Sequence, residues 1–82
     1  MSHVPHELSE EFPNEADRLH ELRQSDSRAA RLMDEYHEVN RALHRAESNV
    51  EPVAEAEEQR LRRVRMSLKD EIARLLREAN AV

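Results

Sequence analysis

The sequence contains no glycine, and this absence excludes several kinds of functional site. Phosphate-binding loops of the Walker and dinucleotide types need glycine so that the backbone can approach the phosphate. Strained nucleophile elbows and two-residue hairpin turns also depend on it. None of these sites can be present in its standard form. Helices need no glycine, and the abundant residues Ala, Glu, Arg and Leu are all strong helix formers.

The chain also lacks cysteine and tryptophan, and it has one Phe and one Tyr. Without cysteine there can be no disulfide and no thiolate metal site. A chain of 82 residues forms one domain with a small core, and such domains usually need disulfides, metal or self-association. We therefore expect no cofactor, and we expect a second copy of the chain, and another protein, as partners.

Long hydrophobic runs are absent as well. No run approaches the ~20 residues of a membrane-spanning helix, and the N-terminus has no apolar signal segment. These features predict a soluble cytoplasmic protein with no membrane span.

The net charge of −5 is concentrated at the N-terminal end. Residues 1–26 hold seven acidic side chains and two arginines, which is a net charge of −5. Residues 27–82 hold eleven acids and eleven bases, so this part is neutral. Because nucleic-acid binding needs a basic face, general binding of nucleic acid is not expected.

Breaks in the helical pattern divide the chain into an acidic N-terminal helical arm, residues 1–25, and a helical hairpin, residues 26–82. In the arm, residues 5–12 read as a short amphipathic helix, Pro13 ends it, and Asn14 can cap the next one.

Ser25 or Asp26 can cap the first hairpin helix, which is predicted at residues 26–48. Ser48, Asn49 and Pro52 mark a turn at 49–53, and the second helix is predicted at 54–80.

Both hairpin helices carry a coiled-coil pattern. The first has apolar residues at the a and d positions of a heptad, and the second repeats them every 3.5 residues on average. The residues predicted to form this packing seam are Leu32, Tyr36, Val39, Leu43, Leu61, Val64, Leu68, Ile72 and Leu75. Met66 and Leu76 lie off the stripe.

Because short connections favour antiparallel neighbours, the pattern predicts an all-α fold: an antiparallel two-helix coiled-coil hairpin with a short N-terminal helical arm, dimerising into a helical bundle. In the alternative, the turn straightens into one long helix that pairs with another chain. Ion pairs at i, i+4 spacing are expected from Glu58 to Arg62 and from Asp70 to Arg74.

The histidines do not form a predicted metal or catalytic site. His37 and His44 are seven residues apart, so about 10.5 Å of helix separates them and they cannot share an ion. His3 and His6 leave open a weak metal site at the N-terminus. A di-metal carboxylate site needs repeated Glu-x-x-His spacing, which the sequence does not have. No serine stands in a recognisable triad spacing, so we expect no enzyme activity.

A basic run, Arg60, Arg62, Arg63 and Arg65, follows an acidic stretch. These side chains form a possible polar partner patch, and they carry the alternative function of a nucleic-acid-associated regulator. The structural interpretation is that they flank the seam and pair with acids of a neighbouring helix, since Leu61 and Val64 within the run belong to the seam.

Several segments resemble a known family. "ARLMDEYHEVNRALHRAESNVEP" at residues 30–52 and "LKDEI" at 68–72, with the N-terminal segments "MSHVPHELSEEFP" and "RLHELRQSD", are similar to the small bacterial YdcH-like family of unknown function. The resemblance implies a coiled-coil helical hairpin with no established activity, and it supplies no functional residues. One departure is Ala29, where the family often has an aromatic residue. The expected function is that of a non-enzymatic protein–protein interaction or scaffold module acting through a helical coiled-coil surface.

Overall fold

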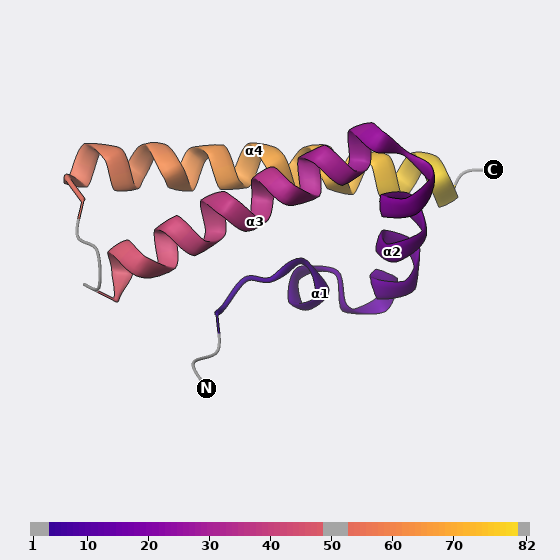
Figure 1. The fold of residues 1–82 in the computed structure, drawn as a ribbon, viewed down its shortest axis with the longest axis horizontal. Helices are drawn as coiled ribbons and strands as arrows, with labels where there is room; N and C mark the ends of the chain where they lie inside the picture. The colour runs from indigo at the N-terminus through magenta and orange to yellow at the C-terminus, as the bar shows by residue number, and fades with distance from the viewer. Residues whose placement is uncertain (1–3, 49–52, 81–82) are drawn as a thin grey trace.

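The computed structural model describes residues 4–48 and 53–80, and their regular structure is helical. The elements are α1 (Leu8–Glu11), the 3-10 turn η1 (Pro13–Glu15), α2 (Ala16–Ser25), α3 (Ser27–Glu47) and α4 (Glu55–Asn80) (Figure 1). No strand occurs in the described ranges, so the prediction of an all-α fold is confirmed. Residues 49–52 of the predicted turn lie outside these ranges. Within them, no helix is both long enough and apolar enough to cross a bilayer.

The start of α3 is fixed by a capping side chain. Of the two predicted candidates, Asp26 is the N-cap, with extended backbone angles of φ −134° and ψ 109°. Its Oδ1 atom accepts hydrogen bonds from the backbone N–H of Arg28 at 2.9 Å and of Ala29 at 3.3 Å. The cap satisfies donors that a helix start would otherwise leave unpaired, and it separates α3 from α2.

The N-terminal arm differs in detail from the sequence prediction. The first helix begins at Leu8 because His6 has a φ of 63°, which an α-helix cannot contain. Asn14 does not cap α2. It lies inside η1, where Glu15 N–H donates to the Phe12 carbonyl at 3.0 Å, and the N-cap of α2 is Glu15 without a side-chain bond.

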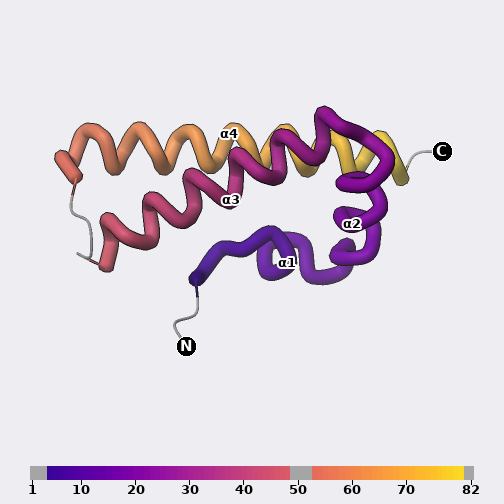
Figure 2. The backbone as a smooth tube through the Cα atoms, in the orientation of Figure 1, coloured from indigo at the N-terminus to yellow at the C-terminus, as the bar shows by residue number. Residues whose placement is uncertain are grey.

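The two long helices, α3 and α4, lie side by side (Figures 1 and 2). Ion pairs join them near both ends of α3. Arg28 Nη2, at the start of α3, is 3.1 Å from Glu71 Oε2, and Arg62 Nη2 is 2.9 Å from Glu47 Oε2 at the end of α3. An ion pair near each end of α3 therefore helps to fix how α3 and α4 are aligned.

Ion pairs within α4 follow the expected spacing in one case. Arg62 is 2.7 Å from Glu58 Oε2, as predicted. Arg74 pairs with Glu71 at 3.2 Å, although the prediction was Asp70. Glu71 also forms an ion pair with Arg28 of α3, so its carboxylate contacts two guanidinium groups.

One apolar cluster joins the arm to the long helices. Its buried members are Leu8, Leu19, Ala29, Met33, Tyr36, Leu68, Ile72 and Leu76. Leu76, which was placed off the seam, is only 1% exposed. The core is wider than a two-helix seam because Leu8 of α1 and Leu19 of α2 add to it.

Candidate functional site: the two flanks of α3 and α4

The nine residues of the predicted packing seam do not share one environment. Five are buried: Tyr36, Leu43, Leu61, Leu68 and Ile72. The other four are only partly buried: Leu32, Val39, Val64 and Leu75. The predicted seam is therefore enclosed along part of its width and open along the rest.

The partly buried residues form what we call the outer strip: Leu32, Val39, Val64 and Leu75. Seven residues separate the two members on α3 and eleven separate those on α4, so each pair returns to one face of its helix. Leu32 and Val64 line the same shallow groove of about 510 Å³, which places both helices' members on one surface. Arg28, Arg60, Arg63 and Glu71 also line this groove.

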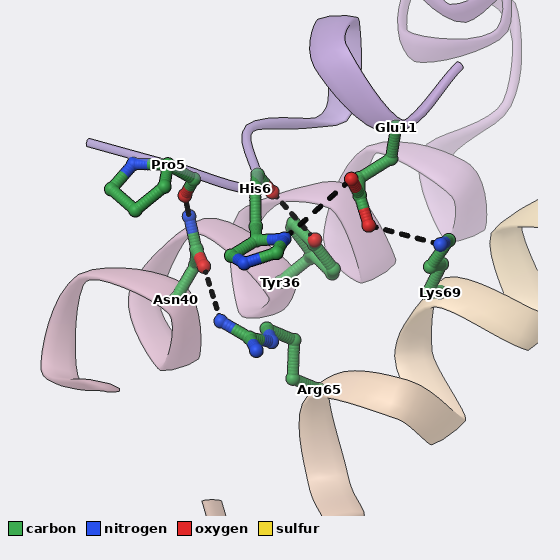
Figure 3. A network of polar contacts seen from close by, with 7 residues as sticks. All are labelled: Pro5, His6, Glu11, Tyr36, Asn40, Arg65 and Lys69. Atoms are coloured by element: carbon green, nitrogen blue, oxygen red, sulfur yellow. Dashed lines mark hydrogen bonds and ion pairs between the residues drawn. The ribbon is translucent and has the colours of Figure 1, made fainter. Parts of the chain in front are cut away.

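The opposite flank of α3 and α4, which we call the inner flank, is covered by the N-terminal arm (Figure 3). Tyr36 Oη donates a hydrogen bond to the His6 carbonyl at 2.6 Å. One turn further along α3, Asn40 Nδ2 donates to the Pro5 carbonyl at 2.9 Å. Two successive carbonyls of the arm are thus bound by two side chains of one helix.

These two side chains are fully enclosed. Tyr36 is 0% and Asn40 is 1% exposed. From α4, Arg65 Nη1 donates to Asn40 Oδ1 at 2.9 Å, so Asn40 connects the arm to both long helices. Burial is the main cause that raises the pKa of Tyr36 to about 12, so its hydroxyl remains protonated and able to donate well into the alkaline range.

A carboxylate fixes the other end of the arm. Lys69 Nζ of α4 donates to Glu11 Oε1 at 2.9 Å, and His6 Nδ1 lies 3.6 Å from Glu11 Oε2. The hydrogen bond from Lys69 lowers the pKa of Glu11 below its usual value, against an opposing effect of burial. The negative form of Glu11 is therefore the form that the docked arm stabilises.

This shift predicts a loss of stability in acid. Because the pKa of Glu11 is lowered in the folded chain, its contribution is complete above the unfolded pKa and is lost as the pH falls through the folded pKa. Glu11→Gln should lower the free energy of unfolding at about pH 6 by less than about 1 kcal/mol, since solvent screens the pair, and should have no such effect at about pH 2. Urea titrations of both proteins at the two pH values measure it. An equal loss at both would contradict the assigned role of the charge.

The two histidines of α3, His37 and His44, have different surroundings. His37 Nδ1 faces the arm, 3.1 Å from Glu7 Oε2, but it is buried without a well-aligned hydrogen bond, so the contact is an ion pair only when the imidazole is protonated. His44 lies two turns further along α3. Within residues 4–48 and 53–80, no three His, Cys, Asp or Glu side chains are grouped to hold a metal. His3 lies outside the described residues.

Most of the basic run is engaged by other side chains. Arg60 donates to both oxygens of Glu57 at 2.7 Å, and Arg62 contacts Glu47 and Glu58. The hydrogen bond from Arg60 lowers the pKa of Glu57.

Arg65 points to the inner flank, where Asn40 accepts its hydrogen bond. Arg63 differs from these three: it is exposed, and it forms no ion pair with another described residue.

Sequence reasoning missed the inner flank. The sequence did not indicate that one surface would bring together Glu11, Asn40, Arg65 and Lys69, because their contacts join segments far apart in the chain. One signal was available: Asn40 follows Tyr36 by four residues, so a polar side chain adjoins the seam on the same helix face.

Comparisons with known proteins give a family and no function. No curated protein and no solved structure matches the chain. The family model described as "Protein of unknown function (DUF465)" matches residues 30–76, which is more than half of the sequence and includes two of the segments that resemble the YdcH-like family, residues 30–52 and 68–72. The chain belongs to this uncharacterised family, DUF465.

Proposed function

We propose that this chain is a non-enzymatic protein–protein interaction module of the cytoplasm. Its working unit is an antiparallel coiled-coil hairpin made by α3 and α4, and its binding surface is the outer strip. A second copy of the chain covers this strip, which gives a four-helix bundle. The bundle then serves as a scaffold for a further protein.

The observation that carries the proposal is the apolar outer strip. Leu32, Val39, Val64 and Leu75 are core-type residues at seam positions, yet a single chain buries them only in part. A second helix pair laid against the strip would bury more apolar surface, at about 25 cal/mol per Å². A small domain without disulfides gains most from such an addition.

Charges beside the strip favour a second copy as the occupant. Glu35 lies three residues after Leu32 and four before Val39, so it borders the strip on α3. Arg63 borders it on α4. Both are exposed, and neither forms an ion pair with another described residue. A two-fold axis parallel to the helices would place α3 of one copy opposite α4 of the other, so the acidic border of each copy would lie on the same side of the interface as the basic border of its partner.

Substitutions in the strip test this surface. Leu32→Asp combined with Val64→Asp should convert a dimer into a monomer, because it would bury four unpaired carboxylates in the interface. Met66→Asp is the matched control, since Met66 is 66% exposed and lies off the strip. Sedimentation equilibrium gives the masses, and circular dichroism shows whether the helices persist. A double variant that stays helical and dimeric would contradict the proposal.

Charge reversal tests the orientation. Glu35→Arg and Arg63→Glu should each weaken the dimer by about 1 kcal/mol or less, because each replaces an attraction between the two charged borders by a repulsion, twice in a dimer. The chain carrying both substitutions should recover most of the loss, since the pairs are restored with reversed sign. If the two losses simply add in the doubly substituted chain, these residues do not face each other.

The alternative of a nucleic-acid-associated regulator has less support, because Arg60, Arg62 and Arg65 are already hydrogen-bonded to side chains of the same chain. It predicts salt-sensitive nucleic-acid binding that weakens when the four arginines of the run become glutamine. A chain that binds no nucleic acid at low salt does not have this function.

A further inference from the structure

We propose that the inner flank is a binding site for acidic peptide segments that form a turn followed by a short helix, and that the chain's own N-terminal arm occupies it as a replaceable intramolecular ligand. The incoming segment comes from a partner protein and has the chemistry of the arm. It supplies two successive backbone carbonyls, an apolar side chain like Leu8, and a carboxylate like Glu11. This site is separate from the outer strip and does not depend on dimerisation.

The first argument is that the flank recognises the backbone. Tyr36 and Asn40 donate to the carbonyls of His6 and Pro5, and neither bond involves an arm side chain. Every peptide has backbone carbonyls, so a segment from another chain that forms the same turn at Pro5 and His6 can make the same bonds. Sequence selectivity then rests on the pocket that buries Leu8 to 5% exposure and on Lys69, which binds Glu11.

The second argument is that a contact between α3 and α4 that does not involve the arm orients one of the donors. Arg65 donates to Asn40 Oδ1 and so directs the Nδ2 donor of Asn40 outward (Figure 3). The two donors on α3 are one turn apart, and the two cations on α4, Arg65 and Lys69, are also one turn apart. A rigid helix pair holds all four groups, and preorganisation of this kind lowers the cost of binding a segment.

The third argument is that the arm is held less firmly than the helices beneath it. Its helix α1 has four residues. His6 has a positive φ of 63°, a conformation that a residue with a Cβ adopts at a cost of about 1 kcal/mol. A helix of one turn next to a strained residue opens locally at lower free energy than the long helices of the core. Opening of the arm would uncover Tyr36, Asn40 and Lys69 while α3 and α4 stay paired.

Charge complementarity sets the kind of partner. The arm side of the contact brings Glu7 and Glu11, and residues 1–26 have a net charge of −5. The flank brings Arg65 and Lys69, with Arg62 lining the same hollow between arm and α4. A basic or neutral peptide would lose these interactions, so the site selects acidic segments.

The test uses the full chain and a fluorescein-labelled peptide of residues 4–15. Leu8→Asp releases the arm, and fluorescence anisotropy measures binding of the peptide. The released chain should bind about tenfold or more tightly than the unchanged chain, whose own arm competes. A peptide with Glu11→Lys should not bind, and Lys69→Glu in the released chain should abolish binding of the original peptide.

A second release variant guards against misfolding. The substitution Glu11→Lys in the chain places a like charge against Lys69 and leaves Leu8 unchanged. Circular dichroism shows which of the two release variants retains its helices, and that variant is used for the binding measurements. Equal affinity of released and unchanged chains, no binding to a folded released chain, or binding that survives Lys69→Glu would each overturn the proposal. Masses from sedimentation report on the outer strip independently, so loss of the dimer leaves this test unaffected.

Discussion

Replacing Ile72 by alanine lowers the free energy of unfolding by about 3 kcal/mol. Ile72 is 0% exposed and lies in the cluster that includes Tyr36, Leu68 and Leu76. The substitution removes buried methyl and methylene groups and leaves a cavity that the neighbouring side chains cannot fill. For a domain of this size the loss is a large fraction of the total stability, which is about 4–12 kcal/mol.

Urea denaturation followed by circular dichroism measures this effect. Met66→Ala, in the same helix, is the control: its side chain is 66% exposed, and its loss should change the free energy of unfolding by less than about 0.5 kcal/mol. Comparable effects of the two substitutions would mean that α4 does not pack with the face assigned to it.

Replacing Asn40 by leucine is the second large effect, at about 2–3 kcal/mol of lost stability. Leucine has a similar volume, so the loss comes from hydrogen bonding rather than from a cavity. The Pro5 carbonyl loses its donor, and the Arg65 guanidinium loses its acceptor beside a buried position. A buried group left without its partner costs about 1–3 kcal/mol. Hydrogen exchange at the arm amides should also accelerate, because the arm loses one of its two carbonyl contacts.

Asn40→Asp separates the two bonds. An aspartate keeps an oxygen for Arg65 but places a second oxygen against the Pro5 carbonyl, so it should release the arm while α3 and α4 remain joined. Exchange should then accelerate at the Phe12 amide, which bonds to the Leu8 carbonyl, and stay slow within α4. Uniform acceleration in the arm and in α4 would contradict the bridging role of Asn40.

The sequence predicted those features of the fold that depend on local periodicity. The 3.5-residue repeat indicated helices, and of the two candidates for the cap of α3, Ser25 and Asp26, Asp26 is correct. The Glu58–Arg62 pair was predicted from i, i+4 spacing alone. Such features follow from neighbours within one or two turns, so one sequence contains the information needed.

The inner flank could not be predicted in the same way. The bonds from Tyr36 to His6 and from Asn40 to Pro5 span 30 and 35 residues, and their acceptors are backbone carbonyls that every residue carries. Tyr36 was expected to act only in packing, because the heptad pattern reports burial and not the direction of a hydroxyl. Leu76 was missed for a related reason: a two-helix seam does not include the arm that widens the core.

The mass of the unchanged chain in solution tests the central claim, that the outer strip is covered by a second copy. Sedimentation equilibrium over a wide range of concentrations should give twice the 9.6 kDa mass of one chain, with dissociation only at the lowest concentrations. A mass of 9.6 kDa at every concentration would contradict the claim, because Leu32, Val39, Val64 and Leu75 would then remain uncovered by another copy.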